Sequence, residues 1–342
     1  MTLSVRKMQD DDRKDWDDFV LSCPEATFFH RSGWQEVIER AFGHQTHFLL
    51  AERAGKIEGI LPLARIRHFY FGHSLSSLPF CVYGGIAAST DAAKTALDLE
   101  AQKIAAQLEV DYLEYRNVRK FHEDWPSKDL YVTFRKEIDP DVEQNMKNIP
   151  RKQRAMVRSG IKHGLSSEID ENPGRFFDVF ADNMLRHGTP ALSKHYFSLL
   201  FEVFGKDCEV LCVTHQGEVV SSVLSFYFRD EVLPYYAGDT LKARSLAAND
   251  FKYWELMRRS CERGCRMFDY GRSKIGTGSF DFKKNWGFEP APLSYEYQLH
   301  RSTSVPDQNP LNPKYQLFIK AWRKLPVSVA NFVGPHIVKY LG

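Results

Sequence analysis

The chain contains 342 residues, which is enough for about two or three domains. Hydrophobic residues make up 43% and charged residues 26% of the chain, so a wholly disordered or fibrous protein is excluded. The 46 Lys and Arg residues and 44 Asp and Glu residues leave a net charge of +2. That balance excludes a uniformly basic nucleic-acid coat protein but permits a local basic patch.

The first residues, MTLSVRKMQDDD, contain no apolar segment of the kind found in secretion signals, and no run of about 20 apolar residues follows. We therefore expect a cytoplasmic protein. The cysteines are expected to be buried, reduced thiols, because their spacing lacks the tight Cys-x-x-Cys pairs of zinc sites, and no metal site is predicted. They are Cys23, Cys81, Cys208, Cys212, Cys261 and Cys265.

The first half of the chain contains a strand–turn–strand pattern. It spans residues 47–67, with Ala54 and Gly55 at the turn. A helix is predicted over 91–108, and a strand over 110–118, which reads VDYLEYRNV. This order of elements is typical of an α/β unit.

A run of cations follows at 147–164, KNIPRKQRAMVRSGIKHG. Arg151, Arg154, Arg158 and Lys162 are spaced three and four residues apart, which places them on one face of a helix. Pro150 is expected to begin this helix and Gly164 to end it. A solvated helix face is one interpretation. A run of only positive charges, in a chain whose net charge is close to zero, is also typical of a site for a phosphate-bearing ligand. We therefore predict that the four cations bind substrate.

The second half repeats the order of the first. Helices are predicted at 176–185, 195–204 and 249–264, and strands at 208–214, 219–228, 232–238, 266–270 and 293–300. The turn at Gln216-Gly217 matches the one at Ala54-Gly55, and 265–273 matches 110–118, at offsets of 217 − 55 = 162 and 265 − 110 = 155 residues. The pattern indicates a tandem duplication of one α/β unit with a mixed sheet.

Four segments carry a family resemblance: TFFHRSGWQEVI (27–38), LPFCVYGGI (78–86), RHGTPALSKHYF (186–197) and the segment 249–287, which begins NDFKYWELM. They resemble the FemAB-related proteins and, within these, the branch associated with exosortase and PEP-CTERM systems. The resemblance covers nearly the whole chain. It implies two tandem GNAT-like domains (the acyl-CoA N-acyltransferase fold) at 1–140 and 141–302, and a linker with a helical tail at 303–342.

The turn at 235–250, YYAGDTLKARSLAAND, lies where CoA-dependent GNAT enzymes carry a glycine-rich loop that binds pyrophosphate. Here Arg244 is followed by Ala247 and Ala248, and an alanine methyl obstructs the close backbone approach that glycine allows. The first copy, 83–94, has glycines but no basic residue before its helix. Neither copy predicts a clear CoA site, which favours a carrier-bound or tRNA-bound donor. Arg244 and Asn249 are predicted to bind substrate.

Residues 268–287, FDYGRSKIGTGSFDFKKNWG, contain the predicted catalytic residues. Asp269 and Arg272 end a strand, where α/β proteins place their sites, although a structural ion pair between them is an equal alternative. In Fem-type transferases a lysine in the matching segment is expected to stabilise the oxyanion of acyl transfer, and the resemblance assigns this role to Lys283. The short helix is expected to bury Phe282 and Trp286 and to turn Lys283 toward the opening. Trp286 is counted among the substrate-binding residues.

The motif MLRHGTP at 184–190 is typical of a turn between two helices. His187 and Thr189, together with Tyr236 and Asp239, are nevertheless predicted to bind the acceptor. An amine must lose a proton to attack, and His187, Asp239 or Asp269 could accept it, so no general base is assigned.

The tail at 311–342 follows a linker rich in Pro and Asn, 303–313. A cluster of cations precedes an apolar stretch, and a weak contact of residues 314–342 with a membrane surface is one interpretation. Docking on the core is favoured, because Pro326 and Pro335 interrupt any long amphipathic helix. The cations are Lys314, Lys320, Arg323 and Lys324.

The resulting hypothesis is an N-acyl or aminoacyl transferase of envelope, exopolysaccharide or protein-sorting biology, peripheral to the inner face of the membrane if the tail binds lipid. No tightly bound cofactor is expected. The donor is aminoacyl-tRNA, acyl-CoA or an acyl carrier, and the acceptor is a small-molecule or peptide amine. Two alternatives stay open: a CoA-dependent GNAT N-acetyltransferase, and a non-catalytic module that binds a carrier or glycan.

Overall fold

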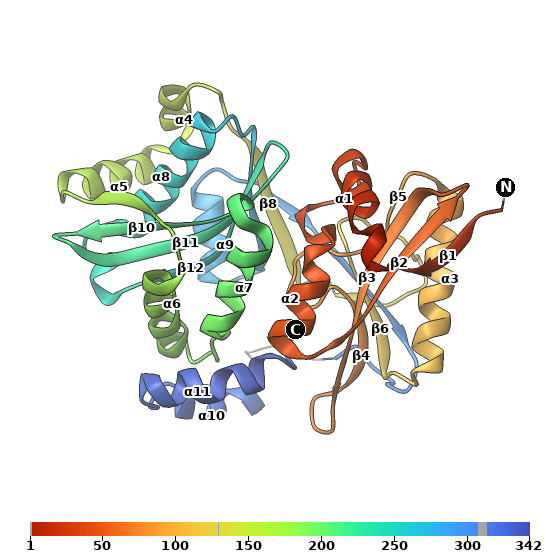
Figure 1. The fold of residues 1–342 in the computed structure, drawn as a ribbon. Helices are drawn as coiled ribbons and strands as arrows, with labels where there is room; N and C mark the ends of the chain where they lie inside the picture. The colour runs from red at the N-terminus through yellow and green to blue at the C-terminus, as the bar shows by residue number, and fades with distance from the viewer. Residues whose placement is uncertain (1, 129, 307–312) are drawn as a thin grey trace. The chain divides into compact units, whose positions relative to one another are not determined.

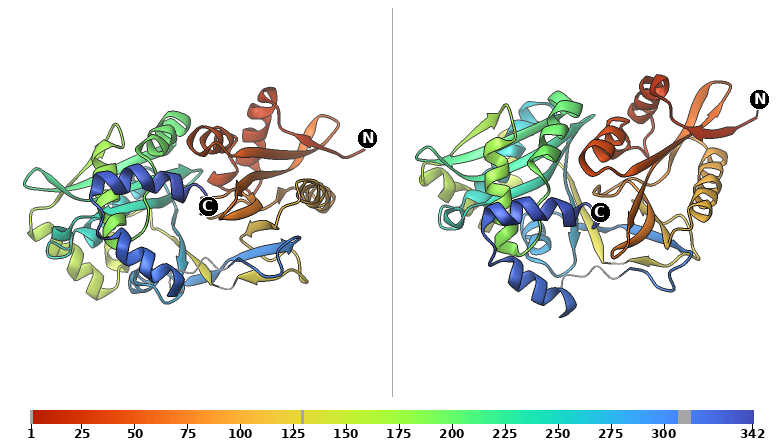
Figure 2. Two further views of the ribbon diagram at one scale, coloured as in Figure 1. Left: turned by 90° about the horizontal axis from the view of Figure 1, so that it is seen from below. Right: turned by 60° about the horizontal axis from the view of Figure 1, so that its bottom comes forward.

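The computed structural model describes residues 2–128, 130–306 and 313–342, so most of the predicted linker lies outside the described residues. The chain divides into two compact units (Figures 1 and 2). Unit 1 comprises Met1–Tyr131, Pro292–Asp307 and Lys339–Gly342, and unit 2 comprises Val132–Ala291 and Gln308–Val338.

Unit 1 is built on a mixed sheet with the strand order β1-β2-β3-β4-β6-β15-β7, to which β5 adds by pairing with β3. The strands are β1 (Ser4–Lys7), β2 (Gln45–Arg53), β3 (Lys56–His68), β4 (Gly72–Ser77), β5 (Ala87–Ala88), β6 (Tyr112–Asn117), β7 (Ser127–Lys128) and β15 (Ser294–Leu299), and the helices are α1 (Arg13–Ser22), α2 (Gly33–Phe42) and α3 (Asp91–Gln107).

Alternating side chains bury both faces of this sheet. Leu49 belongs to the apolar cluster that α3 completes with Leu97 and Ala101. Its neighbour Phe48 points to the other face, where it stacks on Trp16 of α1 with ring centroids 5.5 Å apart. Unit 1 is therefore a sheet between two helical layers.

Unit 2 has the same architecture, with the strand order β14-β8-β13-β12-β11-β10-β9. The strands are β8 (Tyr131–Glu137), β9 (Ser166–Asp170), β10 (Cys208–His215), β11 (Glu218–Phe228), β12 (Glu231–Asp239), β13 (Met267–Lys274) and β14 (Pro290–Pro292). The helices are α4 (Val142–Asn148), α5 (Arg151–Lys162), α6 (Gly174–His187), α7 (Lys194–Phe204), α8 (Ala248–Glu262), α9 (Gly278–Asn285), α10 (Pro313–Trp322) and α11 (Val327–Val338). In Figure 1, α5 and α8 lie on one side of this sheet and α6 on the other.

The predicted duplication is confirmed by the strand order. Read from β9, the second sheet matches the first position by position, so that β2, β3, β4 and β6 correspond to β10, β11, β12 and β13. The sixth position differs in origin. It is filled in unit 2 by β8, the first strand of the continuous segment 132–291, and in unit 1 by β15, which returns from beyond that segment.

The two predicted hairpin turns are equivalent in detail. Ala54 and Gly55 both have positive φ, 55° and 74°, and so do Gln216 and Gly217, at 52° and 83°. Two such residues form the turn that suits the twist of a two-residue hairpin. A β-bulge follows at Glu58 in the first hairpin and at Val220 in the second, again 220 − 58 = 162 residues apart.

The unit boundaries differ from the predicted domains. The first break falls after Tyr131, not after residue 140, and the strand predicted at 293–300 pairs with β6 of unit 1. Hydrogen bonding decides this, because β15 pairs with β6 along all six of its residues. A strand assigned to the second domain by its place in the sequence thus completes the sheet of unit 1.

The tail helices α10 and α11 dock on the end of α6. Trp322 and Ala330 are buried with Leu185. This is the favoured interpretation of the tail, although Leu317 and Phe332 remain 77% and 74% exposed. None of the helices in the described part of the chain is both long and apolar enough to cross a bilayer. The six cysteines are buried thiols that form no disulfide, as expected.

Candidate active site

The sheet of unit 2 contains a gap in its hydrogen-bonded ladder. The parallel strands β12 and β13 pair only through Glu231–Met267 and Val232–Phe268, and then continue without pairing to each other. A bulge at Tyr235 adds local twist to β12. The carboxyl ends of these strands therefore separate, which is where α/β proteins place their sites.

The loop after β12 leads into the first turn of α8. Ala247, immediately before this helix, has the left-handed conformation that normally favours glycine, with a φ of 54°. The N–H groups of a first helical turn have no intrahelical partners and attract anions. Trp286 fixes this turn, because its indole N–H donates to Asp250 Oδ1 at 2.9 Å. Burial raises the pKa of Asp250, and the bond from Trp286 opposes the change.

Lys283 on α9 points at the end of β13 and is buried, with 7% of its surface exposed. Its ammonium donates to the carbonyl oxygens of Tyr270, Gly271 and Arg272, at 2.8, 3.2 and 3.2 Å. Burial lowers its pKa from 10.5 to about 7, and the charge of Asp269 opposes this change. The expectation of a poorly solvated cation is met, but Lys283 faces backbone carbonyls and not an open surface.

Asp269 lies on β13 and is also buried, with 1% exposed. Its Oδ1 accepts a hydrogen bond from the N–H of Gly271 at 2.7 Å, and its Oδ2 lies 3.3 Å from Nε of Arg135 on β8. Arg135 also contacts Glu231. Asp269 thus forms an ion pair with Arg135, a partner that was not predicted, because β8, distant in sequence from β13, lies beside it. The side chain of Arg272 is exposed, and its catalytic role stays a prediction.

A second buried cation lies near the end of β12. Lys252 on α8 is fully buried, and its ammonium lies 3.0 Å from Asp239 Oδ1. Ser221 donates to the same oxygen, and Arg186 at the end of α6 donates to the Asp239 carbonyl. The carboxylate of Asp239 is therefore held by two elements of its own unit.

Comparison with known proteins bears on this arrangement. Residues 144–284, which run from α4 to α9, match the Acetyltransferase (GNAT) domain family. No curated protein matches the chain. The crystal structure of FemX is similar to this chain. The similarity covers 92% of this chain and 100% of FemX, with 15% sequence identity and a TM-score of 0.69. A tandem GNAT protein from the clavulanic acid biosynthesis pathway is also similar. That similarity covers 90% of this chain and 100% of the other, with 12% sequence identity and a TM-score of 0.56. The chain has a tandem GNAT fold.

A further similar structure is the C-terminal domain of a protein named as a lysylphosphatidylglycerol synthetase, from Agrobacterium fabrum. The similarity covers 84% of this chain and 92% of that one, at 12% identity and a TM-score of 0.57. At these identities the likeness is one of fold. Within the tandem GNAT fold, the family match falls in unit 2, the unit that contains the ladder gap and Lys283.

The predicted basic helix exists as α5, between Pro150 and Gly164. Its buried residues are Gln153, Val157 and Gly160, and the cations turn away from them. No ion pair joins these cations to a carboxylate within the ranges that the structure describes. The cations are Arg151, Arg154, Arg158 and Lys162.

The C-terminal half of α5 lies against the first turns of α8. A Cβ on Gly160 of α5 would lie 2.8 Å from Cβ of Phe251 on α8, so the two helices are in close contact at this point. Arg158 and Lys162, on either side of Gly160, are exposed. On the helix these two cations lie nearly opposite Gly160, so they are on the face of α5 that is turned away from α8, and their binding of a phosphate stays a prediction.

The other predicted binding residues are distributed unevenly. His187 and Thr189 are exposed at the end of α6, where Arg323, immediately after α10, donates to the His187 carbonyl. Tyr236 is partly buried on β12, and its hydroxyl lies 3.0 Å from that of Tyr196.

Three further predicted residues border the start of α8. Arg244 is exposed in the loop, and Asn249 is partly buried in the first turn. Trp286 is 1% exposed, so it belongs to the core. Its substrate contact stays a prediction, and its observed role is to hold Asp250.

Lys252 and Arg135 were missed by the sequence analysis. Lys252 follows Phe251 in the helix predicted at 249–264, and nothing in the spacing distinguishes it from a solvated helix residue. Arg135 is one of several charges in a short strand. Both cations pair with carboxylates of neighbouring strands, Asp239 and Asp269, and this pairing is visible only once the strand order is known.

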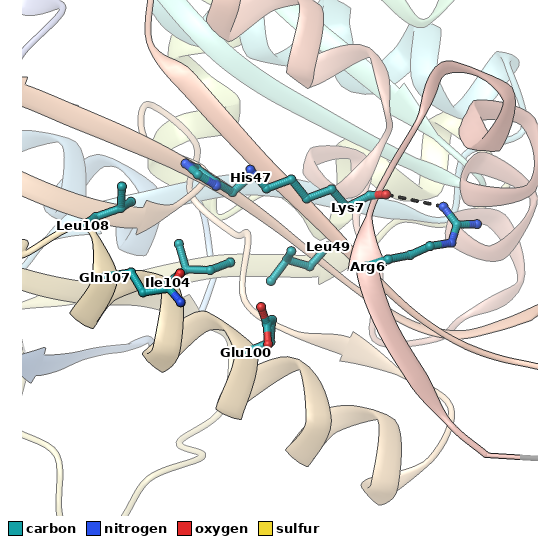
Figure 3. Close-up of a pocket in the computed structure, with 8 residues that line it drawn as sticks. All are labelled: Arg6, Lys7, His47, Leu49, Glu100, Ile104, Gln107 and Leu108. Atoms are coloured by element: carbon teal, nitrogen blue, oxygen red, sulfur yellow. Dashed lines mark hydrogen bonds between the residues drawn. The ribbon is translucent and has the colours of Figure 1, made fainter.

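A separate pocket lies in unit 1, with a volume of about 190 Å³ (Figure 3). Its lining includes His47, whose two ring nitrogens are buried without a hydrogen bond. Burial, with the charges of Lys7 and Arg65, lowers the pKa of His47 to about 4, so the imidazole is neutral. None of the predicted site residues lines this pocket.

Proposed function

We propose that this protein transfers an acyl or aminoacyl group from a phosphate-bearing donor to an amine acceptor, using the site in unit 2. The observation that carries the proposal is the buried ammonium of Lys283 at the separated ends of β12 and β13. Attack of an amine on an acyl carbonyl creates an oxyanion, and a desolvated cation beside it stabilises that charge strongly.

The geometry sets a condition on this role. All three protons of the ammonium already donate to backbone carbonyls, so an oxyanion has to replace one of these acceptors. Among these acceptors, the Arg272 carbonyl, at 3.2 Å, lies nearest to the C-terminal end of β13. Asp269 acts as a positioning residue, because it holds the Gly271 N–H and pairs with Arg135.

The donor is proposed to bear phosphate because unit 2 has two features that attract anions. The first turn of α8 presents its N–H groups, and the solvent-facing side of α5 carries Arg158 and Lys162. The tRNA-bound donor is favoured by the length of the basic face, which extends back to Arg151.

A CoA-dependent acetyltransferase is the second candidate, and one observation favours it. Ala247 already has the left-handed backbone that glycine usually supplies in such loops, so the loop can turn without a glycine. Ala247 is also buried, with 4% of its surface exposed.

The test is direct binding of two probes, bulk aminoacyl-tRNA and acetyl-CoA, to the full chain. Arg151, Arg154 and Arg158 are replaced together by Gln, and a control variant replaces Lys14, Lys56 and Lys103 of unit 1 by Gln. The α5 variant should weaken tRNA binding and reduce the slope of log K against log salt by about 0.7 per lost phosphate contact. The control should retain the wild-type slope.

The possible results distinguish the candidate functions. Binding of acetyl-CoA that is insensitive to the α5 substitutions supports the CoA-dependent candidate. Binding of either probe without turnover of any amine supports the non-catalytic module. Mass spectrometry of ligands that co-purify with the protein identifies the donor independently. The link to envelope, exopolysaccharide or protein-sorting biology stays a prediction from the resemblance.

A further inference from the structure

The hairpin between β3 and β4 ends in three consecutive aromatic residues that point away from unit 1. Phe69 is 97% exposed, Tyr70 78% and Phe71 38%. Single exposed apolar residues are ordinary, but a contiguous aromatic group marks an interaction surface. We call Phe69, Tyr70 and Phe71 the aromatic tip.

The aromatic tip has a defined shape. Nδ1 of His68 accepts hydrogen bonds from the backbone N–H groups of Tyr70 and Phe71, at 3.1 and 3.3 Å. The His68 ring also lies 4.3 Å from the ring of Tyr340, near the end of the chain. Because the turn is already ordered, little conformational entropy is lost when the tip meets a partner.

Cations predominate around the aromatic tip. No Asp or Glu occurs from Gly59 to Thr90, a stretch that includes Arg65 and Arg67. One carboxylate lies at the base of the hairpin end, where Asp111 accepts a hydrogen bond from the N–H of His73 at 2.8 Å. The chain from 313 to 342 lacks acidic residues, and the ammonium of Lys339, which belongs to unit 1, lies 4.9 Å from the Tyr340 ring. Aromatic side chains with Arg67 and Lys339 nearby are complementary to an anionic apolar surface.

We propose that the aromatic tip, with Tyr340, Arg67 and Lys339, binds the surface of a bilayer that contains anionic lipids. Phenyl and phenol rings settle at the level of the headgroups, and nearby cations attract anionic lipid. The contact is interfacial, so the protein lies on the bilayer. It extends the predicted membrane contact of residues 314–342 to a hairpin that the sequence analysis did not identify. It does not depend on the proposed transfer reaction, because it needs no substrate.

The test is flotation of the full chain with vesicles of phosphatidylcholine, alone or mixed with phosphatidylglycerol. The test variant carries Phe69→Ser and Tyr70→Ser. The control carries Leu99→Ser, which removes a side chain that is 61% exposed on α3 of the same unit. We expect the wild type to float with the mixed vesicles. The test variant should partition about tenfold less, and the control should match the wild type.

Further measurements separate the contributions. Arg67→Gln should weaken binding to the mixed vesicles and leave weak binding to pure phosphatidylcholine unchanged. Tyr70→Trp should show blue-shifted fluorescence on the mixed vesicles. The proposal is overturned if the wild type fails to float, or if the test variant floats equally well. It is also overturned if the substitutions in the tip abolish a dimer in solution while vesicle binding is absent, which would identify a second copy of the chain as the partner.

Discussion

Lys283 combines two properties that rarely occur together in a lysine. It is nearly inaccessible to water, and its ammonium has a full set of carbonyl acceptors. Desolvation disfavours the charge and lowers the pKa to about 7, whereas an unfolded lysine titrates near 10.5. Between these values the unfolded chain binds a proton that the folded chain has released.

The folding stability should therefore depend on pH in a particular direction. From about pH 7 to 10.5 the unfolded state binds more protons, so the free energy of unfolding should rise with pH across this window. Lys283→Met should remove this rise, and Lys284→Met, at an exposed neighbour, should retain it. Denaturant titrations across the window measure the effect, and identical curves for Lys283→Met and the wild type would contradict it.

The same substitution tests catalysis once the donor is identified. Loss of one oxyanion donor reduces turnover by about 10²–10³, so Lys283→Met should fall by this factor with little change in substrate binding. Lys284→Met should retain full turnover. If Lys283→Met folds and turns over normally, the residue is only a structural cap of β13.

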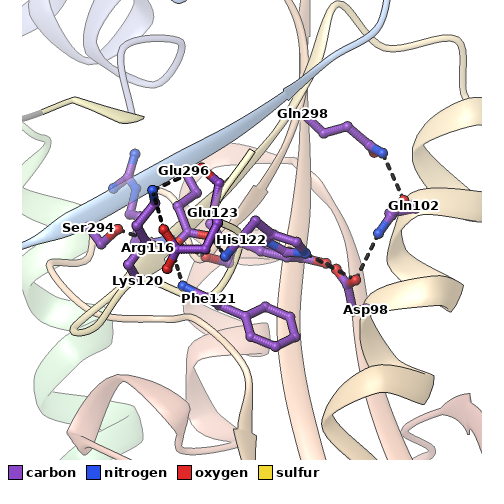
Figure 4. Close-up of polar contacts among 12 residues, drawn as sticks. Asp98, Gln102, Arg116, Lys120, Phe121, His122, Glu123, Ser294, Glu296 and Gln298 are labelled. Atoms are coloured by element: carbon purple, nitrogen blue, oxygen red, sulfur yellow. Dashed lines mark hydrogen bonds and ion pairs between the residues drawn. The ribbon is translucent and has the colours of Figure 1, made fainter. Parts of the chain in front are cut away.

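His122 forms a second buried network, which holds β15 in unit 1 (Figure 4). Its Nε2 lies 3.1 Å from Asp98 Oδ2 on α3, and its Nδ1 lies 2.9 Å from Glu296 Oε2 on β15. The ring stacks on Trp125 at 3.6 Å. Burial opposes protonation, but the bonds to the two carboxylates outweigh it and raise the pKa to about 9.

This network should lose its contribution in alkaline solution. The folded pKa of His122 lies above the unfolded value of 6.5, so its stabilisation is complete below about pH 6.5 and disappears as the pH rises through about 9. His122→Gln should cost about 1–3 kcal/mol at pH 6 and much less at pH 10. His195→Gln, at an exposed position, is the control. A cost that does not change with pH would refute the protonated network.

At the scale of the elements, the contact of α6 with β12 positions Asp239. A Cβ on Gly238 would lie 2.7 Å from the Cα and 2.8 Å from the N of Phe180, so only glycine permits this approach. The contact brings Arg186, at the end of α6, to the carbonyl of Asp239.

Gly238→Ala should therefore separate α6 from the sheet. We expect a loss of about 1–3 kcal/mol in the free energy of unfolding, because backbone atoms cannot move aside as a side chain can. The control is Gly278→Ala, where a Cβ meets no atom within 4 Å and the backbone is unstrained. It should be neutral or stabilise by up to about 1 kcal/mol. Equal stabilities of the two variants in denaturant would contradict the close approach.

At the scale of the whole molecule, the return of β15 makes unit 1 depend on a distant part of the chain. Unit 1 needs β15, which follows the segment 132–291 of unit 2, whereas β8 of unit 2 belongs to that segment itself. Glu296 of β15 is fully buried and accepts from the N–H groups of Phe121 and His122. Without β15 these groups lose their acceptor.

A fragment of residues 1–131 should consequently fail to fold alone. It lacks β15, leaves the edge of β6 open and exposes Tyr115 and Leu113. Circular dichroism and proton NMR of this fragment should show no cooperative unfolding transition. Addition of a peptide spanning 292–307 should restore one at least partly. A fragment that unfolds cooperatively on its own would show that unit 1 folds without β15.

The sequence alone was sufficient for the repeated α/β unit and for most helices. Local signals specify these: the Ala54-Gly55 and Gln216-Gly217 turns need only two residues of positive φ, and the apolar stripe of α8 needs only its own spacing. The basic face of α5 follows from the same periodicity, so its four cations were found correctly.

Only the tertiary structure decided which strands and charges meet. The neighbours of β15 and β8 depend on hydrogen bonds between segments more than a hundred residues apart, and no local pattern encodes such pairing. The partner of Asp269, the burial of Lys252 and the direction of Lys283 follow from that pairing. The aromatic tip is equally invisible in the sequence, because a run of Phe and Tyr in a strand predicts burial until the end of the hairpin is known.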